Sequence, residues 1–384
     1  MNHVPMSDGL VWARVVRPNV PIVYLDLNHF IFMARANTGD PTAPAGYKEL
    51  LDEATLAVRE ERVVLPLSSE HVFEIGGIKD PKQRKDVADV METLSGFHYL
   101  LGRPDIARLE IEAGIEAILE EVPELLPTSL LGTSFGWAFG MVGGVKIVDE
   151  HGNDVSAAAR QRMGAKEFSE FIRSANHTIE RGMLDGPPDD EIPILREKYG
   201  YAPELARDGH KSRLDIELDL SQRLASMPKW RRGRLRDLVS AREISHEWLD
   251  AINRAREDRV RSGRKLFKPS DDQMRRFMAA MPHTQVAISM KTRYHRNPAH
   301  IWTTNDITDI DAMSVAYSYC DAVFTDKEAR AALADSKELR TFKTFLPRTP
   351  GELTDWLTEK PKLPASGLLV PYPPRPPTGL TALG

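Results

Sequence analysis

The sequence predicts an α/β fold with a parallel central sheet flanked by helices and interrupted by a mostly α-helical insertion. Two observations lead to this fold class. Apolar strand-like runs alternate with helical patterns over residues 21–100, and this order implies parallel strands joined by right-handed crossovers. The alternation then stops, because residues 101–298 carry helical spacing with few strand signals. We therefore expect one core assembled from 21–100 and 299–360, with the insertion between its halves.

The first half of the expected core alternates strands with helices. Residues 21–26 form one short apolar run and residues 63–67 form another. Between them, apolar side chains over 47–58 recur at helical spacing, which predicts a helix behind the first strand. Asp80 and Pro81 then provide a helix cap followed by proline at the first helical position. The pattern is typical of a βαβα unit.

The second half of the expected core, 299–360, contains a helix headed by acidic residues. A short apolar strand over 322–326 follows this helix, and a further strand is expected at 341–346. Prolines recur over 361–377 and exclude a helix or a central strand there. We therefore expect residues 361–384 to form an extended tail.

Composition limits the class of protein. The chain has 384 residues, 41% of them hydrophobic and 28% charged, which is typical of a globular protein with a real core. The single cysteine, Cys320, excludes a disulfide framework and a cysteine-rich zinc site, and it fits a reducing cytoplasm. The uncharged stretch 128–145 is interrupted by glycines, so we expect a buried loop there instead of a membrane span. With no recognisable signal peptide, a cytoplasmic protein without membrane contact is expected.

Two acidic stretches, far apart in the sequence, predict the halves of a single metal site. Asp26 ends the first apolar strand, Asp311 lies in the acid-headed helix, and Asp326 ends the strand after it. Acids at the carboxyl ends of buried parallel strands lie where open α/β sheets place their ligands. Several carboxylates in one crevice repel one another and suit a hard cation such as Mg²⁺ or Mn²⁺.

These residues resemble the PIN-domain nucleases, a family of small Rossmann-like domains with acids at the carboxyl edge of a parallel sheet. Residues 24–26, Tyr-Leu-Asp, are similar to the first family motif. Residues 68–75 are similar to the second, with Glu74 in the place of the family glutamate. Asp311 followed by alanine looks like the family helix that opens on Asp-Ala, and residues 322–326 look like the strand ending in threonine and an acid.

The resemblance implies a metal-dependent nuclease and assigns its residues. The catalytic and metal-binding residues would be Asp26, Glu74, Asp311 and Asp326. The residues that orient ligands or waters behind them would be Asn28, Thr325 and Asp309. Two metal ions about 3.5–4 Å apart would neutralise the scissile phosphate and activate a water.

Alternatives stand beside three of these assignments. Glu70 lies one turn before Glu74 on the same helix face and competes for its role. Asp306 and Asp309 compete in the same way with Asp311. Where the family often has its fourth acid, two places after the threonine, this chain has a lysine.

A basic segment from Lys229 to Arg296 has 18 Lys and Arg residues against 8 Asp and Glu residues, a charge of +10 in a chain of net charge −5. Its sign opposes that of the expected metal site and favours a phosphate-backbone partner. Four basic residues directly precede the second acidic stretch and are placed to present a phosphate to the metals: Lys291, Arg293, His295 and Arg296.

Within the basic segment, one aromatic residue lies among arginines. Trp230 is followed by Arg231, Arg232 and Arg234, a mixture that suits stacked bases and phosphates. The alternative is that Trp230 packs in the helical core while the arginines are solvated.

We therefore expect a nuclease using Mg²⁺ or Mn²⁺, with RNA favoured over DNA by the resemblance alone. Two other classes compete with this hypothesis. One is a catalytically inactive PIN-like module that binds nucleic acid, for which replacement of one of the four acids would be the sign. The other is a metal-dependent phosphohydrolase acting on a small substrate, for which the basic segment would play no part in catalysis.

Overall fold

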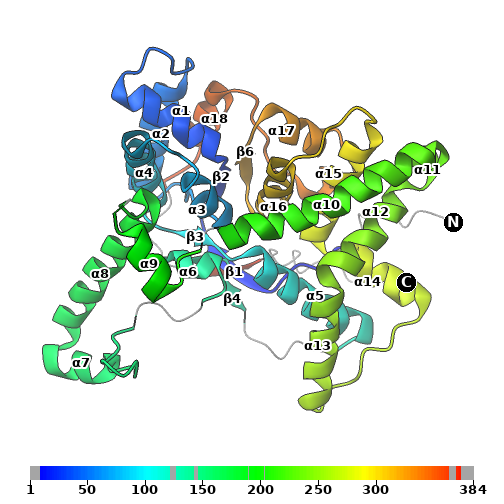
Figure 1. Cartoon of the computed structure of the whole chain (residues 1–384), viewed down its shortest axis with the longest axis horizontal. Helices are drawn as coiled ribbons and strands as arrows, with labels where there is room; N and C mark the ends of the chain where they lie inside the picture. Colours follow the sequence, from blue (N-terminus) through cyan, green and yellow to red (C-terminus); the bar gives the residue numbers. More distant parts are fainter. Residues whose placement is uncertain are drawn as a thin grey trace.

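The computed structural model describes residues 9–121, 127–141, 146–188, 190–202, 204–362 and 369–372. Helices dominate the structure: 65% of the described residues are helical and only 6% lie in a few short strands (Figure 1). The expected Rossmann-like core built on a parallel sheet is therefore wrong. The molecule is a mostly helical assembly.

The elements follow the chain in this order. The first helices are α1 (Leu27–Thr38), α2 (Tyr47–Arg59), α3 (Ser69–Ile75) and α4 (Pro81–Ser95). The middle of the chain forms α5 (Arg103–Leu119), α6 (Phe135–Ala138), α7 (Ser156–Met163), α8 (Ala165–Asp185), α9 (Ile192–Tyr199), α10 (Glu204–Ser226), α11 (Pro228–Gly233), α12 (Leu235–Glu243), the π-helical turn η2 (Ile244–Trp248), α13 (Leu249–Arg261) and α14 (Asp271–Ala280). The last helices are α15 (Pro282–Arg296), α16 (Thr304–Tyr319), α17 (Lys327–Ala334), the 3₁₀ turn η3 (Lys337–Phe342) and α18 (Pro350–Thr358). The strands are β1 (Val15–Pro18), β2 (Val23–Leu25), β3 (Tyr99–Leu100), β4 (Thr128–Ser129), β5 (Leu131–Gly132), β6 (Ala322–Phe324) and β7 (Leu369–Tyr372).

The strands β2 and β6 pair in parallel at the centre of the molecule, with Leu25 opposite Phe324. Both strands are buried along their whole length. Their side chains alternate between two hydrophobic cores, because successive strand residues point to opposite sides. Val23 and Leu25 belong to the first core, whereas Tyr24 belongs to the second.

The sheet does not extend beyond this pair because the neighbouring segments make only single bridges. Val64 and Leu67 each form one isolated parallel bridge, and Pro66 between them has no N–H to donate. The strand expected at 341–346 is likewise reduced to one bridge at Phe345, since η3 occupies the chain up to Phe342. Helices must therefore supply most of the buried surface.

Helices cover both sides of the central strand pair (Figure 1). The first core is formed with α1, α2, α4 and α18, and the second with α5, α15, α16 and α17. Further cores join α5 to η2, α13 and α14, and α10 to α12 and α15. The boundary expected between 298 and 299 cuts between α15 and α16, two helices that pack against each other.

A helix-start signal predicted α4 correctly, and apolar spacing predicted α2 correctly. Asp80 caps α4 and accepts a hydrogen bond from the Lys82 N–H at 2.9 Å, and α2 covers the predicted 47–58. In the expected tail, residues 369–372 form β7, which pairs antiparallel with β1 at the edge of its sheet. An edge position is where a strand tolerates proline. Of the other tail residues, 363–368 and 373–384 lie outside the described residues.

The uncharged stretch expected to be a buried loop forms β4, β5 and α6, and its residues 142–145 lie outside the described residues. Among the helices that the structure describes, none is long and apolar enough to cross a membrane.

Candidate functional site

Asp26 and Asp326 end the two parallel strands at the centre of the molecule. The Asp26 N–H donates to the Phe324 carbonyl oxygen at 2.9 Å, which continues the β2–β6 pairing by one residue. Each acid also precedes a helix, Asp26 before α1 and Asp326 before α17. Asp326 accepts a hydrogen bond from the Ala329 N–H at 3.0 Å. The strand pairing thus brings acids from both ends of the chain to one edge.

Glu74 on α3 and Asp309 on α16 join them, and we call these four residues, Asp26, Glu74, Asp309 and Asp326, the acidic cluster. The pKa of Asp26 is raised to about 6 by its burial and then by the negative charge of Asp326. The pKa of Asp309 is raised to about 8 by burial, then by Asp26 and Asp326. Burial also raises the pKa of Glu74 well above its usual value, with Asp26 and Asp309 adding to the effect. Each carboxylate therefore disfavours ionisation of the others.

The histidines beside Asp26 supply no compensating positive charge. His29 is buried, its Nδ1 lies 2.7 Å from the Tyr47 hydroxyl, and burial lowers its pKa to about 4. Burial likewise lowers the pKa of His71 to about 4, and its Nε2 lies 2.7 Å from the Leu25 carbonyl oxygen. Both rings are neutral at neutral pH. The side-chain charges that act most strongly on the acidic cluster are accordingly negative.

Two oxygen atoms at this edge have no hydrogen-bond partner in the described part of the chain. One is the buried Oδ2 of Asp26, a residue that is only 8% exposed, and the other is the hydroxyl of Thr325. Asn28 is exposed, and its side chain hydrogen-bonds to the Asp26 carboxyl and lowers the pKa of that group. Because buried polar atoms in folded proteins are normally paired, the unpaired oxygens indicate a place for a further group.

Asp311 has opposite surroundings, although it lies only two residues after Asp309. Two residues turn an α-helix by about 200°, so the two side chains leave α16 on different faces. Arg213 forms a bidentate pair with the Asp311 carboxylate, with Nη2 2.7 Å from Oδ1, and the Arg103 Nε lies 3.3 Å from Oδ1. Burial alone would raise the pKa of Asp311, but the two arginines hold it well below its usual range. The structure thus places Asp309, and not Asp311, against Asp26 and Asp326.

The Asp311 pair belongs to a larger set of buried charges, which we call the ion-pair network: Arg103, Arg213, Glu217, Glu243, Glu247, Lys291 and Asp311. Within it, the Lys291 Nζ donates to Glu243 at 2.7 Å and lies 2.8 Å from a Glu217 oxygen. His295 pairs with Glu217 at 2.7 Å. Both Lys291 and His295 are buried, so the expectation that they present a phosphate is wrong. Sequence reasoning missed the roles of Arg103 and Arg213, since single arginines on long helices carry no distinguishing pattern.

Glu70, the competitor of Glu74, lies between the acidic cluster and the ion-pair network. It is buried, and its pKa is raised by burial and then by the negative charge of Asp311. Glu74 instead experiences Asp26 and Asp309 first. Of the two glutamates, Glu74 is the one that the structure groups with Asp26.

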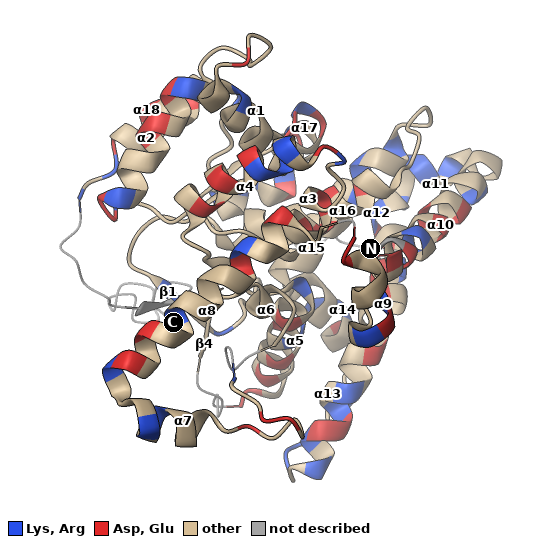
Figure 2. Ribbon diagram, turned by 60° about the vertical axis from the view of Figure 1, so that its left-hand side comes forward, with Lys and Arg blue, Asp and Glu red and all other residues tan. Residues whose placement is uncertain are grey.

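The helix α11, which carries Arg231 and Arg232, lies at the C-terminal end of α10 (Figures 1 and 2). Trp230 on α11 is 42% exposed, so the alternative in which it packs in the helical core is wrong. Arg232 and Arg234 are exposed and Arg231 is half-buried. Closer to the acidic cluster, Arg293 pairs with Asp335 at 2.7 Å, and Arg296 is exposed at the end of α15.

The acidic cluster offers the right donor type for a hard cation but not a preformed cage. Carboxylate oxygens are the ligands that Mg²⁺ takes in proteins. Within the described ranges, however, no group of three or more His, Cys, Asp or Glu side chains is arranged to hold a metal ion. The carboxylates would have to turn toward one another to share an ion.

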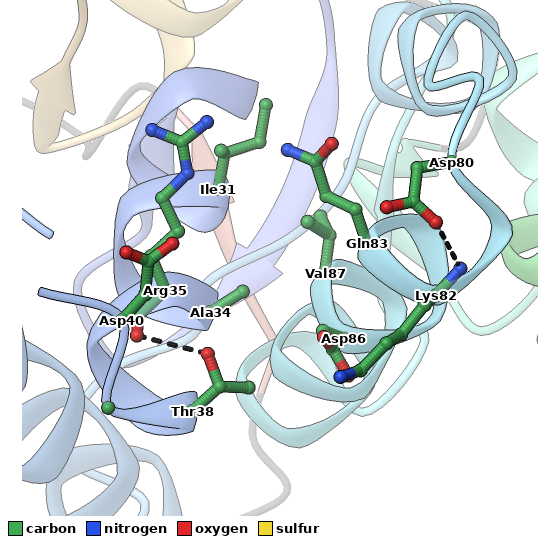
Figure 3. A pocket seen from close by; sticks show the side chains of 11 residues that line it. Ile31, Ala34, Arg35, Thr38, Asp40, Asp80, Lys82, Gln83, Asp86 and Val87 are labelled. Atoms are coloured by element: carbon green, nitrogen blue, oxygen red, sulfur yellow. Dashed lines mark hydrogen bonds between the residues drawn. The ribbon is translucent and has the colours of Figure 1, made fainter. Parts of the chain in front are cut away.

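A separate cavity of about 440 Å³ lies between α1 and α4 (Figure 3). Charged side chains of both signs line it, among them Arg35, Lys82 and Asp86, and no member of the acidic cluster does. We assign no chemistry to it.

No protein-family model, curated protein or solved structure matches the chain. The resemblance to PIN-domain nucleases therefore depends on the residues of this sequence alone.

Asparagine substitutions at the two neighbouring aspartates of α16 should change stability in opposite directions. Asp309→Asn replaces a carboxyl group whose ionisation the folded state disfavours with a neutral amide, so it should raise the urea midpoint of the metal-free protein. Asp311→Asn leaves Arg103 and Arg213 undercompensated in the interior and should cost about 3–5 kcal/mol. The exposed Asp355 of α18 is the matched control, and Asp355→Asn should leave the midpoint unchanged. Shifts of the same sign at 309 and 311 would contradict these surroundings.

The contribution of Asp309 to the stability of the metal-free protein should fall as pH rises from about 4 to about 8, whereas the buried His29 and His71 contribute a slope of the opposite sign up to about pH 6.5. The pKa of Asp309 is about 8 in the folded state, against about 3.9 in an unfolded chain. Between these values the folded state binds more protons than the unfolded state, so raising the pH favours unfolding. Urea midpoints of the wild type and of Asp309→Asn, measured in EDTA across this pH range, would give the contribution of Asp309 as the difference between the two plots of midpoint against pH. Asp355→Asn should keep the pH dependence of the wild type. The same pH dependence in Asp309→Asn as in the wild type would refute the pKa assignment.

Proposed function

We propose that the protein is a metal-dependent nuclease that hydrolyses phosphodiester bonds at the acidic cluster. One observation carries this proposal: Asp26, Glu74, Asp309 and Asp326 gather from four separate elements, and the nearby charges that dominate are also negative. Such an arrangement opposes folding unless a cation offsets it. Perturbed carboxyl groups of this kind are typical of functional sites.

Each residue of the site has a defined part in this proposal. The four carboxylates would hold Mg²⁺ or Mn²⁺, with the unpaired Oδ2 of Asp26 as the first free donor. A bound ion of this type supplies charge neutralisation at the phosphate and a more acidic water. Asn28 hydrogen-bonds to the Asp26 carboxyl and orients it. Asp311 acts indirectly, because its pairs with Arg103 and Arg213 set the rotation of α16 and hence the direction of Asp309.

Nucleic acid is the proposed substrate, and RNA is favoured by the resemblance to PIN-domain nucleases. The exposed Trp230 and its neighbouring arginines support a strand as the partner, since aromatic rings and guanidinium groups together suit bases and phosphates. From Arg213, beside α16, α10 continues to Ser226, a rise of about 20 Å at 1.5 Å per residue. A substrate that reaches both places must therefore span several nucleotides.

Labelled RNA and DNA oligonucleotides incubated with Mg²⁺, Mn²⁺ or EDTA test the activity. Cleavage should require the metal and should be lost in Asp26→Asn and Asp309→Asn, because each removes a ligand oxygen's charge. Asp355→Asn should cleave like the wild type. Retention of full activity by Asp309→Asn, with loss in a folded Asp311→Asn protein, would transfer the ligand role back to Asp311. Absence of cleavage of every oligonucleotide by the wild type would refute the nuclease.

The arginines Arg231, Arg232 and Arg234 should bind the phosphates of the strand. Replacing Arg231, Arg232 and Arg234 together by glutamate should weaken binding of many sequences alike. It should also flatten the salt dependence by about 0.7–0.9 units of slope for each lost contact. Binding across a salt series, measured by fluorescence anisotropy, gives both quantities.

The control for this experiment carries the same change of charge elsewhere. The exposed residues Arg59, Arg162 and Arg173, all replaced by glutamate, lie outside the basic segment and should leave the slope closer to that of the wild type. Equal slopes in the two triple variants would show that the segment acts only through net charge.

A further inference from the structure

A cavity of about 350 Å³ opens between the C-terminal end of α15 and the helix α17. This volume falls within the range of small-ligand pockets, about 300–1,000 Å³. Its lining residues are Arg293, Tyr294, Arg296, Asn297, His300, Glu328, Ala331 and Ala332.

Residues beside this cavity also lie beside the acidic cluster. His300 lies between two acids, with Nε2 3.3 Å from an Asp306 oxygen and Nδ1 3.4 Å from a Glu328 oxygen. Asp306 and Glu328 both act on Asp309 of the acidic cluster. The cavity therefore lies beside the acidic cluster, with His300, Asp306 and Glu328 between them.

The cavity wall presents one cation that the described residues do not neutralise. Arg293 pairs with Asp335, whereas Arg296 forms no ion pair within the described part of the chain. Arg296 also lies near a second arginine, since its positive charge adds to burial in lowering the pKa of Arg236. Arg236 is paired with Glu338 and Arg293 with Asp335, so of these three arginines the exposed Arg296 is the one whose charge can attract an anion, and its planar fork matches phosphate geometry.

Two aromatic rings that line the cavity, those of Tyr294 and His300, pack against each other. Tyr294 stacks on His300 with ring centroids 4.6 Å apart and an interplanar angle of 11°. Tyr294 is buried and the His300 side chain is 8% exposed, so neither presents an open face for stacking a base. The geometry suits recognition of a phosphate more than recognition of a base.

We propose that this cavity is a phosphate subsite, with Arg296 as its principal cation, for the strand whose neighbouring phosphodiester lies at the acidic cluster. The inference rests on the proposed nuclease function and adds a position to it. The cluster itself repels a polyanion, so a strand needs a nearby cation to approach it. Arg296 supplies that cation from the adjoining cavity, closer than the distant α11 arginines.

Binding of a fluorescein-labelled oligouridylate in EDTA tests the subsite without cleavage. Arg296→Ala should weaken binding about tenfold, the size expected for loss of a hydrogen-bonded charge, and Arg296→Lys should recover part of the loss. Ala331→Phe fills the cavity without changing charge and should weaken binding to a similar degree. Arg173→Ala, on the exposed face of α8, is the matched control and should bind like the wild type.

The outcomes separate the subsite from the nuclease. Unchanged binding by both Arg296→Ala and Ala331→Phe would overturn the subsite even if the wild type cleaves RNA. Weakened binding by both variants would support the subsite even if no metal restores cleavage, in which case the nuclease fails alone. Uridine 5′-monophosphate should bind much more weakly than the oligouridylate; equal affinity would identify a site for small phosphate compounds and overturn the strand subsite.

Discussion

The buried pairing of Asp311 with Arg103 and Arg213 is the interaction on which the arrangement of the molecule depends. These residues lie on α16, α5 and α10, and Glu243, Glu247 and Lys291 extend the contacts to α12, η2 and α15. Ions inside a protein are tolerated only when they are paired, so each member of the network requires the others to stay in place. The network consequently fixes how the helices of the middle of the chain pack on α16. It also fixes the rotation of α16 about its own axis.

That rotation separates two kinds of acid on one helix. Asp311 faces cations that keep it ionised, whereas Asp309 faces Asp26 and Asp326 and resists ionisation. A structural explanation suffices for Asp311, because its pairs stabilise the fold. It does not suffice for Asp309, since a carboxylate among carboxylates contributes nothing favourable to folding. The contrast is the physical reason for proposing a cation at the acidic cluster and none at the ion-pair network.

The sequence predicts the meeting of Asp26 with Asp326 but not the choice between Asp309 and Asp311. Each of the first two acids follows a buried apolar run, and two parallel strands end at the same edge. The choice on α16 depends on Arg213, which lies 98 residues away and belongs to a helix whose spacing reveals only an amphipathic face. The sheet was overpredicted for a related reason: runs such as 63–67 have strand composition, but their pairing is decided by Pro66 and by what packs around them. Helices with caps, such as α4, were predictable because their signals are local.

The helix α10 connects the network to the basic segment and so gives the insertion a place in the proposed function. Arg213 and Glu217 near its middle enter the ion-pair network, while Leu220 and Leu224 nearer its C-terminal end enter a hydrophobic core with α12 and α15. These four positions follow helical spacing, so a single face of α10 is fixed along most of its length. The exposed α11 begins directly after it. The interactions that orient Asp309 therefore also set the distance from α11 to the acidic cluster. The helix α10 would then determine the length of strand that can bind at both places.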